Sequence, residues 1–333
     1  MPGFRLGQGE EADVRVLVAL GGNAMTSPDG RARPEDQIAA AEVAMASVAD
    51  LIDAGVDVLL THGNGPQVGN LLVKNELAAA VVPPVPLDWC GAQTQATIGL
   101  VLCNALEKAL QPRRLERSTA TVVTRTRVSL DDPGFSRPTK PIGRFLSREE
   151  AEPLIEHGQH FEDRGDRGWR RVVASPEPLE ILDATAVVVL MEAGYVVVAA
   201  GGGGIPVVRE EDGSLRGVEC VIDKDLAAAL MADTVGVDRL VIATDVPNAV
   251  LGYGTPDARS IGRVTVQEMR RYAEMGHFAS GSMGPKVEAV CRYVERSGRP
   301  GVITSLDTIV QAVRLESGTI VVPNEIYEES AHA

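Results

Sequence analysis

The chain has 333 residues, a formal net charge of -14, a hydrophobic share of 44% and a charged share of 23%. This length allows one large domain or two lobes, each with its own core, and the composition is typical of a globular enzyme. The acidic charge disfavours nucleic acid or an anionic membrane as a partner, although a small anionic ligand needs only local cations.

Residues 1–13 form a polar lead-in without the apolar stretch of a secretory signal, and no later apolar run is long enough to cross a bilayer. We therefore expect a mobile lead-in and a cytoplasmic protein with no membrane partner. Cysteine usage agrees, because single cysteines among aliphatic residues indicate small buried hydrophobes in a reducing compartment. They are Cys90, Cys103, Cys220 and Cys291.

The first predicted element is a buried strand over 14–20, which runs directly into Gly21, Gly22 and Asn23. Its β-branched and aliphatic residues suit a strand covered on both faces, and the glycines let backbone N–H groups approach a ligand closely. Phosphate and carboxylate oxygens are the usual ligands of such a turn. A strand followed by two glycines is equally an ordinary tight turn, so the neighbouring elements must decide between these interpretations.

Two further predicted strands also end in glycine-rich turns. The turns contain Gly63, Asn64 and Gly65 after the strand over 56–60, and Gly202 and Gly203 after the strand over 195–199. Open α/β sheets bind ligands at the carboxyl ends of their strands, so three such turns predict one ligand-binding edge. The P-loop spacing G-x-x-x-x-G-K-[ST] and the dinucleotide spacing G-x-G-x-x-G are both missing from these turns, which argues against those two families.

Helices and strands alternate along most of the chain. Helices are predicted over 34–53, 91–110, 179–193, 226–232, 285–294 and 306–313, and another helix is predicted after the turn at Pro66. Further strands are predicted over 121–124, 239–243, 301–304 and 319–322. This alternation predicts an α/β fold, a three-layer αβα sandwich around a mainly parallel sheet.

Residues 129–178 interrupt the alternation, because this segment is rich in Pro, Gly, Arg and acidic residues. A structureless loop of this length is unusual, so we expect a small protruding subdomain that acts as a lid over the site. Lys140 lies within it and is either plain surface charge or a residue that the lid brings to the site. His157 and His160 lie in the same charged segment and are expected at the solvated surface.

Two more lysines lie where predicted helices begin. Lys224, between Asp223 and Asp225, precedes the helix over 226–232, and Lys286 opens a later helix. A cation near a helix N-terminus is unfavourable with the helix dipole, so Lys286 is expected to have an anion beside it, with phosphate as the natural candidate. For Lys224, two interpretations stay open. One acid caps the helix while the lysine lies in solvent, or Asp225 bridges two lysines across a site.

Together, these motifs resemble those of the carbamate kinases of the amino-acid-kinase family. The matching segments are 19–24 (ALGGNA), 61–69 (THGNGPQVG), 139–143 (TKPIG), 201–207 (GGGGIPV), 221–226 (VIDKDL) and 276–286, with further matches at 86–88, 90–92, 170–173 and 175–176. The resemblance covers nearly the whole chain, in order, and this combination is far more specific than any single motif.

The resemblance implies reversible phosphoryl transfer between ATP and carbamate, giving ADP and carbamoyl phosphate, with Mg2+ on the nucleotide and a homodimer as the assembly. Such chemistry needs positioning and charge neutralisation more than covalent catalysis, so lysines and backbone N–H groups suffice. It also implies one domain over 14–333 with 129–178 as its lid, 14–215 mainly on the carbamate side and 216–322 mainly on the nucleotide side.

The resemblance also assigns roles to individual residues. The implied catalytic residues are Lys140, Lys224, Asp225 and Lys286, with Asp225 orienting the lysines. The implied sites for carbamate and the transferred phosphoryl group are Gly21, Gly22, Asn23, Gly63, Asn64, Gly65, Gly202 and Gly203. The implied nucleotide-binding residues are Asp223, Thr244, Asp245, Tyr253, Gly281, Ser282 and Met283. It implies no protein side chain as a metal ligand.

The sequence departs from the family pattern at two places. Residues 247–251 (PNAVL) replace the usual turn and strand after 244–246, and Pro247 fixes φ and removes a backbone donor, so the adenine-side loop is expected to take another path. Arg144 stands where the family commonly has proline. Two alternatives therefore stay open: a kinase of another small carboxylate, phosphate or phosphonate, and a non-catalytic nucleotide- or metabolite-binding regulator.

Overall fold

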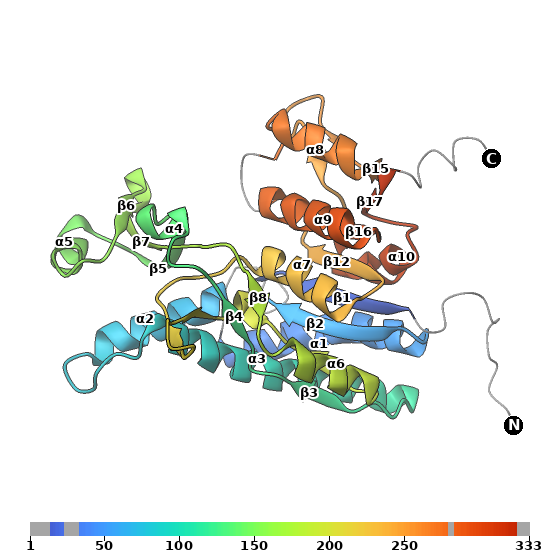
Figure 1. Cartoon of the computed structure of the whole chain (residues 1–333), viewed down its shortest axis with the longest axis horizontal. Coiled ribbons are helices and arrows are strands. Elements are labelled where there is room, and N and C mark those ends of the chain that lie inside the picture. The colour runs from blue at the N-terminus through green and yellow to red at the C-terminus, as the bar shows by residue number, and fades with distance from the viewer. Residues whose placement is uncertain (1–13, 23–32, 279–282, 325–333) are drawn as a thin grey trace, which may run out of the picture.

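An eight-stranded sheet forms the centre of the protein (Figure 1). This computed structural model describes residues 14–22, 33–278 and 283–324, and the strand order is β15-β17-β16-β12-β1-β2-β9-β3. The strands are β1 (Arg15–Leu20), β2 (Asp57–His62), β3 (Thr119–Thr121), β9 (Val196–Val198), β12 (Arg239–Thr244), β15 (Arg263–Thr265), β16 (Gly301–Ser305) and β17 (Thr319–Val322). Only the β16–β17 pairing within this sheet is antiparallel, which confirms the predicted mainly parallel sheet.

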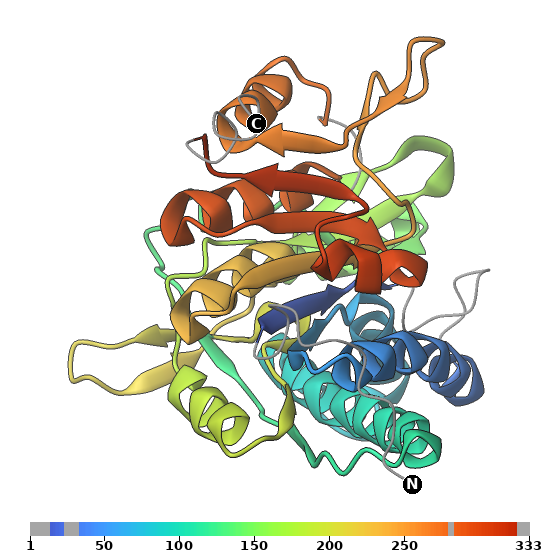
Figure 2. The same cartoon turned by 90° about the vertical axis from the view of Figure 1, so that its right-hand side faces the viewer.

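Helices cover both faces of this sheet (Figures 1 and 2). One face packs against α1 (Pro34–Asp53), α3 (Leu87–Leu110) and α10 (Ile309–Val313). The other face packs against α6 (Ala184–Glu192), α7 (Lys224–Val235) and α9 (Met283–Ser297), and α8 (Val266–Glu274) packs against α9. In β1, Val16 and Val18 are buried on the first face, and Leu17 and Ala19 on the second. Successive strand residues point to opposite faces, so a doubly covered strand is apolar throughout. The predicted three-layer sandwich is confirmed.

Several predicted element bounds are wrong. The helix expected over 179–193 begins only at Ala184, because Glu180–Ile181 form a strand, β8, that pairs with β4 (Arg125–Arg127). The carboxylate of Asp183, just before the helix, accepts hydrogen bonds from the backbone and guanidinium of Arg125. The α3 helix begins at Leu87 instead of Gly91, the strand expected over 121–124 lies at 119–121, and α8 was not predicted.

The segment over 129–178 is structured. It contains α4 (Pro133–Ser136), β5 (Lys140–Leu146), α5 (Arg148–Glu156), β6 (Phe161–Asp163) and β7 (Trp169–Val173), and its strands form an antiparallel sheet in the order β5-β7-β6. Figure 1 shows these elements at one end of the molecule, to the side of the central sheet, where β5 packs against α2 (Gly65–Ala78). This small sheet explains why the alternation of helices and strands is interrupted here.

The remaining elements are short. A four-stranded sheet joins β4 and β8 to β10 (Ile205–Arg209) and β11 (Leu215–Gly217). β13 (Val250–Leu251) pairs with β14 (Arg259–Ser260). Single 3-10 turns occur at η2 (Gln111–Arg113), η3 (Gly165–Arg167), η4 (Gly201–Gly203) and η5 (Leu306–Thr308). Among the residues that the structure describes, no helix has the length and apolar character needed to span a membrane.

The histidine predictions agree with the structure, and the cysteine prediction holds for three of the four residues, because Cys103 is only partly buried. Cys90, Cys220 and Cys291 are buried free thiols whose pKa values are raised chiefly by burial, to about 12 for the latter two. His157 and His160 are exposed.

Candidate functional site

The glycine-rich turns meet at one edge of the sheet, as the sequence predicted. The backbone N–H of Gly21 donates to the carbonyl oxygen of Ala243 at 3.0 Å, and that of Gly63 donates to Leu20 at 3.1 Å, so the ends of β12, β1 and β2 are joined. The turn over 201–204 follows β9, which is the neighbour of β2. The turns that follow β1, β2 and β9 therefore lie together at one edge of the sheet.

The turns after β2 and β9 interlock because glycines leave no side chain between them. A Cβ on Gly201 would lie 2.3 Å from Nε2 of His62, and a Cβ on Gly202 would lie 2.1 Å from Nδ2 of Asn64. Gly202 and Gly203 also have positive φ angles of 66° and 95°, which favour glycine. Close packing and backbone conformation thus account for these glycines without any ligand.

One expectation about these glycines is wrong. The N–H groups of Gly21, Gly63 and Gly203 are already used, the last one donating to Ala200 at 3.0 Å, so they are not offered to a ligand in this structure. The start of α2 is another place where backbone donors face away from the helix, because the first N–H groups of a helix have no partner within the helix. The side chain of Asn64 does not cap this helix and donates to Thr94 Oγ1 at 2.9 Å instead. This helix N-terminus favours an anion.

A carboxylate joins two of the three predicted lysines. Lys224 Nζ donates to Asp225 Oδ1 at 2.5 Å, and Lys286 Nζ donates to Asp225 Oδ2 at 3.1 Å. Asp225 is 3% exposed and Lys286 is 6% exposed, so this cluster lies almost out of solvent. Of the two interpretations left open for Lys224, the bridge between lysines is the one observed. The anion expected beside Lys286 is Asp225 here.

The third lysine reaches the same helix end from the protruding sheet. Lys140, the first residue of β5, donates from Nζ to Asp223 Oδ2 at 3.0 Å. The other oxygen of Asp223 accepts the N–H groups of Asp225 and Leu226, which caps α7. One carboxylate therefore both begins the helix that carries Lys224 and holds Lys140 beside it.

The protonation of these groups follows from burial and charge. Burial lowers the pKa of Lys224, and Lys286 lowers it further, while Asp225 opposes both effects. Burial alone would raise the pKa of Asp223, but Lys140 and the capping N–H groups reverse this, and its net shift is downward. Asp223 is therefore ionised at neutral pH and remains an ion-pair partner for Lys140.

A buried histidine supports the turns from behind. His62 is 1% exposed, burial lowers its pKa to about 4, and its Nδ1 lies 3.1 Å from the carbonyl oxygen of Gly63. The ring is thus neutral at neutral pH and packs against Gly201. Apart from its place in the motif over 61–69, nothing in the sequence singled out this residue.

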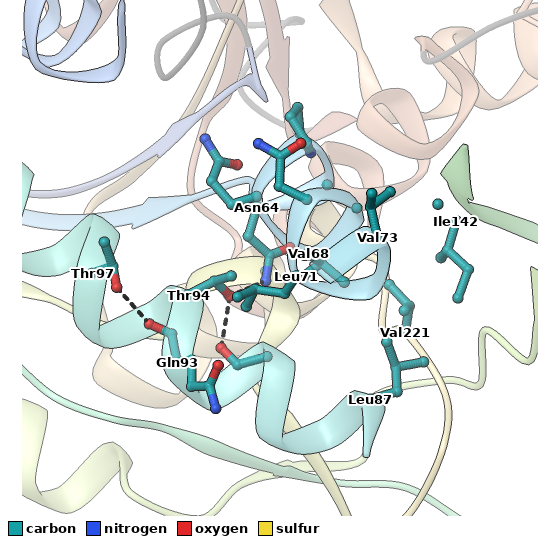
Figure 3. A pocket seen from close by; sticks show the side chains of 18 of the residues that line it. Asn64, Val68, Leu71, Val73, Leu87, Gln93, Thr94, Thr97, Ile142 and Val221 are labelled. Carbon is teal, nitrogen blue, oxygen red and sulfur yellow. Dashed lines mark hydrogen bonds between the residues drawn. The ribbon is translucent and has the colours of Figure 1, made fainter. Parts of the chain in front are cut away.

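A large cleft opens beside the lysine cluster. It has a volume of about 1410 Å³ and is lined by α2, α3, β5 and the turn over 201–204. Figure 3 shows Asn64 at the start of α2 next to Thr94 of α3, with Ile142 of β5 on the far side. Lys140 also lines the cleft. Thr94 and Arg170, a further lining residue, were missed as site candidates, although Arg170 lies in the matching segment 170–173, because apolar periodicity separates buried from exposed faces and does not show which exposed face lines a cleft.

The predicted nucleotide-binding residues are more scattered. Thr244 ends β12 and donates to Asp245 Oδ1 at 2.9 Å, beside the end of β1. Tyr253 lies in the connection between β13 and β14 and is 75% exposed. Met283 begins α9 and packs partly against the core. Asn23, Gly281 and Ser282 lie outside the described residues.

The carboxylates of Asp223 and Asp225, at this edge of the sheet, are already engaged by lysines. Among the residues that the structure describes, no group of three or more His, Cys, Asp or Glu side chains is placed to bind a metal ion. Both oxygens of Asp225 are bonded to lysines. Mg2+ commonly binds substrate phosphates and water with one or two carboxylates, which such a site permits.

Comparison with known proteins places the chain in a family. The model of the amino acid kinase family matches residues 14–305. A carbamate kinase of Thermococcus kodakarensis is 46% identical over 312 residues, covering 92% of this chain and 99% of the relative. A carbamate kinase of Trichomonas vaginalis is 42% identical over 314 residues, covering 93% of this chain and 100% of the relative.

A solved structure gives the same result. The carbamate kinase from Giardia lamblia bound to AMP-PNP superimposes with a TM-score of 0.90 at 39% identity, covering 94% of this chain and 100% of that one. The central sheet, the helical layers and the turns described above therefore belong to a fold shared over nearly the whole length of both chains.

Proposed function

Because the chain belongs to the amino acid kinase family and, within it, to the carbamate kinases, we propose that it transfers a phosphoryl group reversibly between ATP and carbamate. The products of the forward reaction are ADP and carbamoyl phosphate. The observation that carries this proposal is the buried Lys224–Asp225–Lys286 cluster at the glycine-rich edge of the sheet.

The cluster suits phosphoryl transfer. The transition state spreads negative charge over the oxygens of the phosphoryl group in flight, so catalysis depends on fixed positive charge more than on covalent chemistry. Asp225 holds two ammonium groups close together at a cost that a phosphoryl group would offset. In a site that excludes water, such charges act more strongly than at a surface.

The bond changes need no proton transfer by the protein. A carbamate oxygen attacks the γ-phosphorus, the new P–O bond forms, and the bond from the γ-phosphorus to the bridging oxygen breaks to release ADP. Carbamate is already an anion, so no proton has to be removed from the nucleophile. This agrees with a site built from lysines, in which His62 is buried and hydrogen-bonded to Gly63.

Individual roles follow from these placements as part of the proposal. Lys224 and Lys286 neutralise the transferring group, Asp225 orients them, and Lys140 joins them from β5 when the protruding segment closes as a lid. The start of α2 holds the acceptor end with Asn64 and Gly65, close to Gly22 and Gly202. The nucleotide lies on the side of Thr244, Asp245, Tyr253 and Met283.

We propose Mg2+ as the divalent ion carried by the nucleotide, where it would screen the phosphate charges. Asp223 and Asp225 are the nearby carboxylates, and both are held by lysines in this structure. The chain itself would therefore contribute position and charge, with most metal ligands coming from phosphate oxygens and water.

A homodimer in the cytoplasm is also part of the proposal. Within the described sheet, β3 is an edge strand, and the adjacent helix α3 exposes Trp89 and Leu100 on its outer side. An edge strand beside apolar side chains suits an interface between two copies. Light scattering of the purified protein checks this, and a monomeric mass at micromolar concentration would contradict it.

The reaction is tested in the ATP-forming direction. We expect the purified protein to produce ATP from ADP and carbamoyl phosphate with Mg2+, and to stop when the metal is chelated. The measurement is ATP formation through a coupled assay. In parallel, labelled ATP is offered to acetate, phosphate and phosphonates as acceptors. No ATP from carbamoyl phosphate would refute the proposal, and faster labelling of another acceptor would replace carbamate as the substrate.

A further inference from the structure

Two arginines of the protruding segment, Arg167 in η3 and Arg170 in β7, lie near each other without an acidic partner. Three others in this region pair with carboxylates: Arg144 with Glu76 and Glu150, Arg164 with Glu162, and Arg171 with Glu219. Neither Arg167 nor Arg170 forms an ion pair with any residue that the structure describes, and the same is true of Arg137 and Arg148, which are exposed, whereas Arg170 is partly buried. Glu162, the cross-strand neighbour of Arg170, is already paired with Arg164.

Both guanidinium groups lie on the same aromatic ring. The Cζ atom of Arg170 is 4.9 Å from the ring centroid of Phe145, and the Cζ atom of Arg167 is 5.5 Å from it. A cation–π contact stabilises each guanidinium, but two like charges beside one ring repel each other. The arrangement therefore lacks a compensating anion.

Burial is also unfavourable for the side chain of Arg170. Its Nε atom is buried and has no hydrogen-bond partner within the described part of the chain. Burial lowers the pKa of Arg170, and the nearby Arg164 and Arg167 lower it further. A buried donor without an acceptor is unfavourable, so an anionic acceptor at this place would be stabilising.

The place is the wall of the large cleft. Arg170 lines it together with Lys140, and Lys74 of α2 lines it as well, exposed and without an ion pair among the described residues. The cleft volume of about 1410 Å³ far exceeds what carbamate needs. Cations thus continue from Lys140 along the cleft, in a chain whose net charge of -14 would otherwise repel anions.

We propose that Arg170, on the cleft wall, and Arg167, which shares the ring of Phe145 with it, form an anion-binding subsite for a phosphoryl dianion. A guanidinium offers a planar fork of N–H donors that matches two phosphoryl oxygens, which an ammonium group does not. Two sources share this chemistry: the phosphoryl group of carbamoyl phosphate as it enters the cleft, and free inorganic phosphate. The first source rests on the proposed function, and the second does not.

The binding test uses inorganic phosphate and needs no turnover. Phosphate is titrated calorimetrically into the nucleotide-free protein and into Arg170→Gln, Arg167→Gln and Arg148→Gln. Arg148 is an exposed residue of α5 that does not line the cleft, so it controls for loss of one charge on the same segment. Arg167 is exposed, so its variant is expected to fold even if the Arg170 variant does not.

We expect phosphate affinity to fall about tenfold in Arg170→Gln, severalfold in Arg167→Gln and not in Arg148→Gln, as the loss of a charge-assisted hydrogen bond predicts. Unchanged affinity in the Arg170 and Arg167 variants overturns the subsite. If Arg170→Gln does not fold, the Arg167 result decides.

The kinetic test separates the two sources. If carbamoyl phosphate is captured here, Arg170→Gln raises its KM about tenfold, leaves the KM of ADP unchanged, and makes kcat/KM less sensitive to salt, because a charge that guides the substrate has been removed. Reduced phosphate affinity with an unchanged KM assigns the subsite to free phosphate. A protein that binds phosphate through these arginines but makes no ATP would refute the proposed reaction and leave the subsite intact.

Discussion

At the scale of single residues, the two oxygens of Asp225 determine how the site is built. Each oxygen bonds to one lysine, and the carboxylate is almost fully buried. Bringing three charges out of water is costly, and it is tolerated only when they pair with good geometry. A network of this kind at a sheet edge is characteristic of a functional site more than of a stabilising one.

Replacing Lys286 should impair turnover more than substrate binding. In Lys286→Met the stem of the side chain still packs, and Asp225 keeps Lys224 as its partner. The missing charge is needed most in the transition state, so we expect kcat to fall about a hundredfold or more, with a smaller effect on the KM of ADP. Steady-state kinetics of ATP formation measure both.

The matched control is Lys108→Met, which removes a lysine that pairs with Glu42 at the surface of the molecule. Its kinetics should equal those of the unaltered protein. Equal turnover in Lys286→Met and Lys108→Met would rule out the role assigned to Lys286.

At this scale, the sequence named side chains that the structure brings together, but it did not reveal all of their contacts. The sequence identified Lys140, Lys224, Asp225 and Lys286 as a set, and the structure gathers them around the start of α7. It did not reveal that the N–H of Gly63 is used by Leu20, because that bond joins neighbouring strands. Contacts between distant segments have no signature in local sequence.

At the scale of elements, the quality of the predicted bounds depends on where each end is determined. α1 has the predicted bounds over 34–53, because Pro34 stands at its first position and its apolar stripe is regular. α6 begins later than predicted, because residues 180 and 181 pair with β4 as strand β8, and the local sequence does not indicate a strand there. Local signals are sufficient only when no tertiary pairing competes with them.

The interlocked turns predict a steric sensitivity. Gly201 has an ordinary φ, but an added methyl group would meet the ring of His62. We expect Gly201→Ala to lower the free energy of unfolding by about 1–3 kcal/mol, as overpacking does. Because the displaced ring lies directly behind the turn over 201–204, kcat/KM should fall as well. Urea unfolding and steady-state kinetics provide the two measurements.

Gly262→Ala is the appropriate comparison, since Gly262 is exposed, has an ordinary φ and has open space where a Cβ would lie. It should change the free energy of unfolding by less than about 0.5 kcal/mol. The packing argument fails if both alanine variants are equally stable.

At the scale of the whole molecule, the protruding segment is attached to the rest by an apolar cluster, in which Ile142 and Val173 pack with Leu72 and Leu87, and by several ion pairs. Its ion pairs to the body include Lys140–Asp223, Arg144–Glu76, Arg171–Glu219 and Glu177–Arg292, and the carboxylates of Glu76 and Glu219 are exposed. Exposed ion pairs typically contribute about 0–1 kcal/mol each. The exposed ion pairs are therefore the weakest of these contacts, and closure of this segment over the cleft would rearrange them first.

Removing the two exposed pairs should loosen this segment alone. In Glu76→Gln with Glu219→Gln, we expect amide hydrogen exchange in β5 and β7 to become about two- to tenfold faster, from the loss of two weak ion pairs. The melting temperature should change by no more than about 2–4 °C, since the central core is untouched. Exchange measured by mass spectrometry, segment by segment, tests this.

Glu42→Gln removes another exposed ion pair, to Lys108, far from β5 in the chain, and serves as the control. It should leave exchange in β5 and β7 unchanged. Identical exchange of these strands in all variants would show that the ion pairs do not hold the segment.

The sequence by itself determined the fold class, the family and the chemical types at the site. Apolar strands, amphipathic helices and ordered motifs are local patterns, and the physics that produces them acts over a few residues. Only the tertiary structure decided that Asp225 bridges Lys224 and Lys286, that Asp223 holds Lys140, and that Arg170 lies on the cleft wall. Charges act on whatever lies near them in space, and the folded chain alone sets those neighbours.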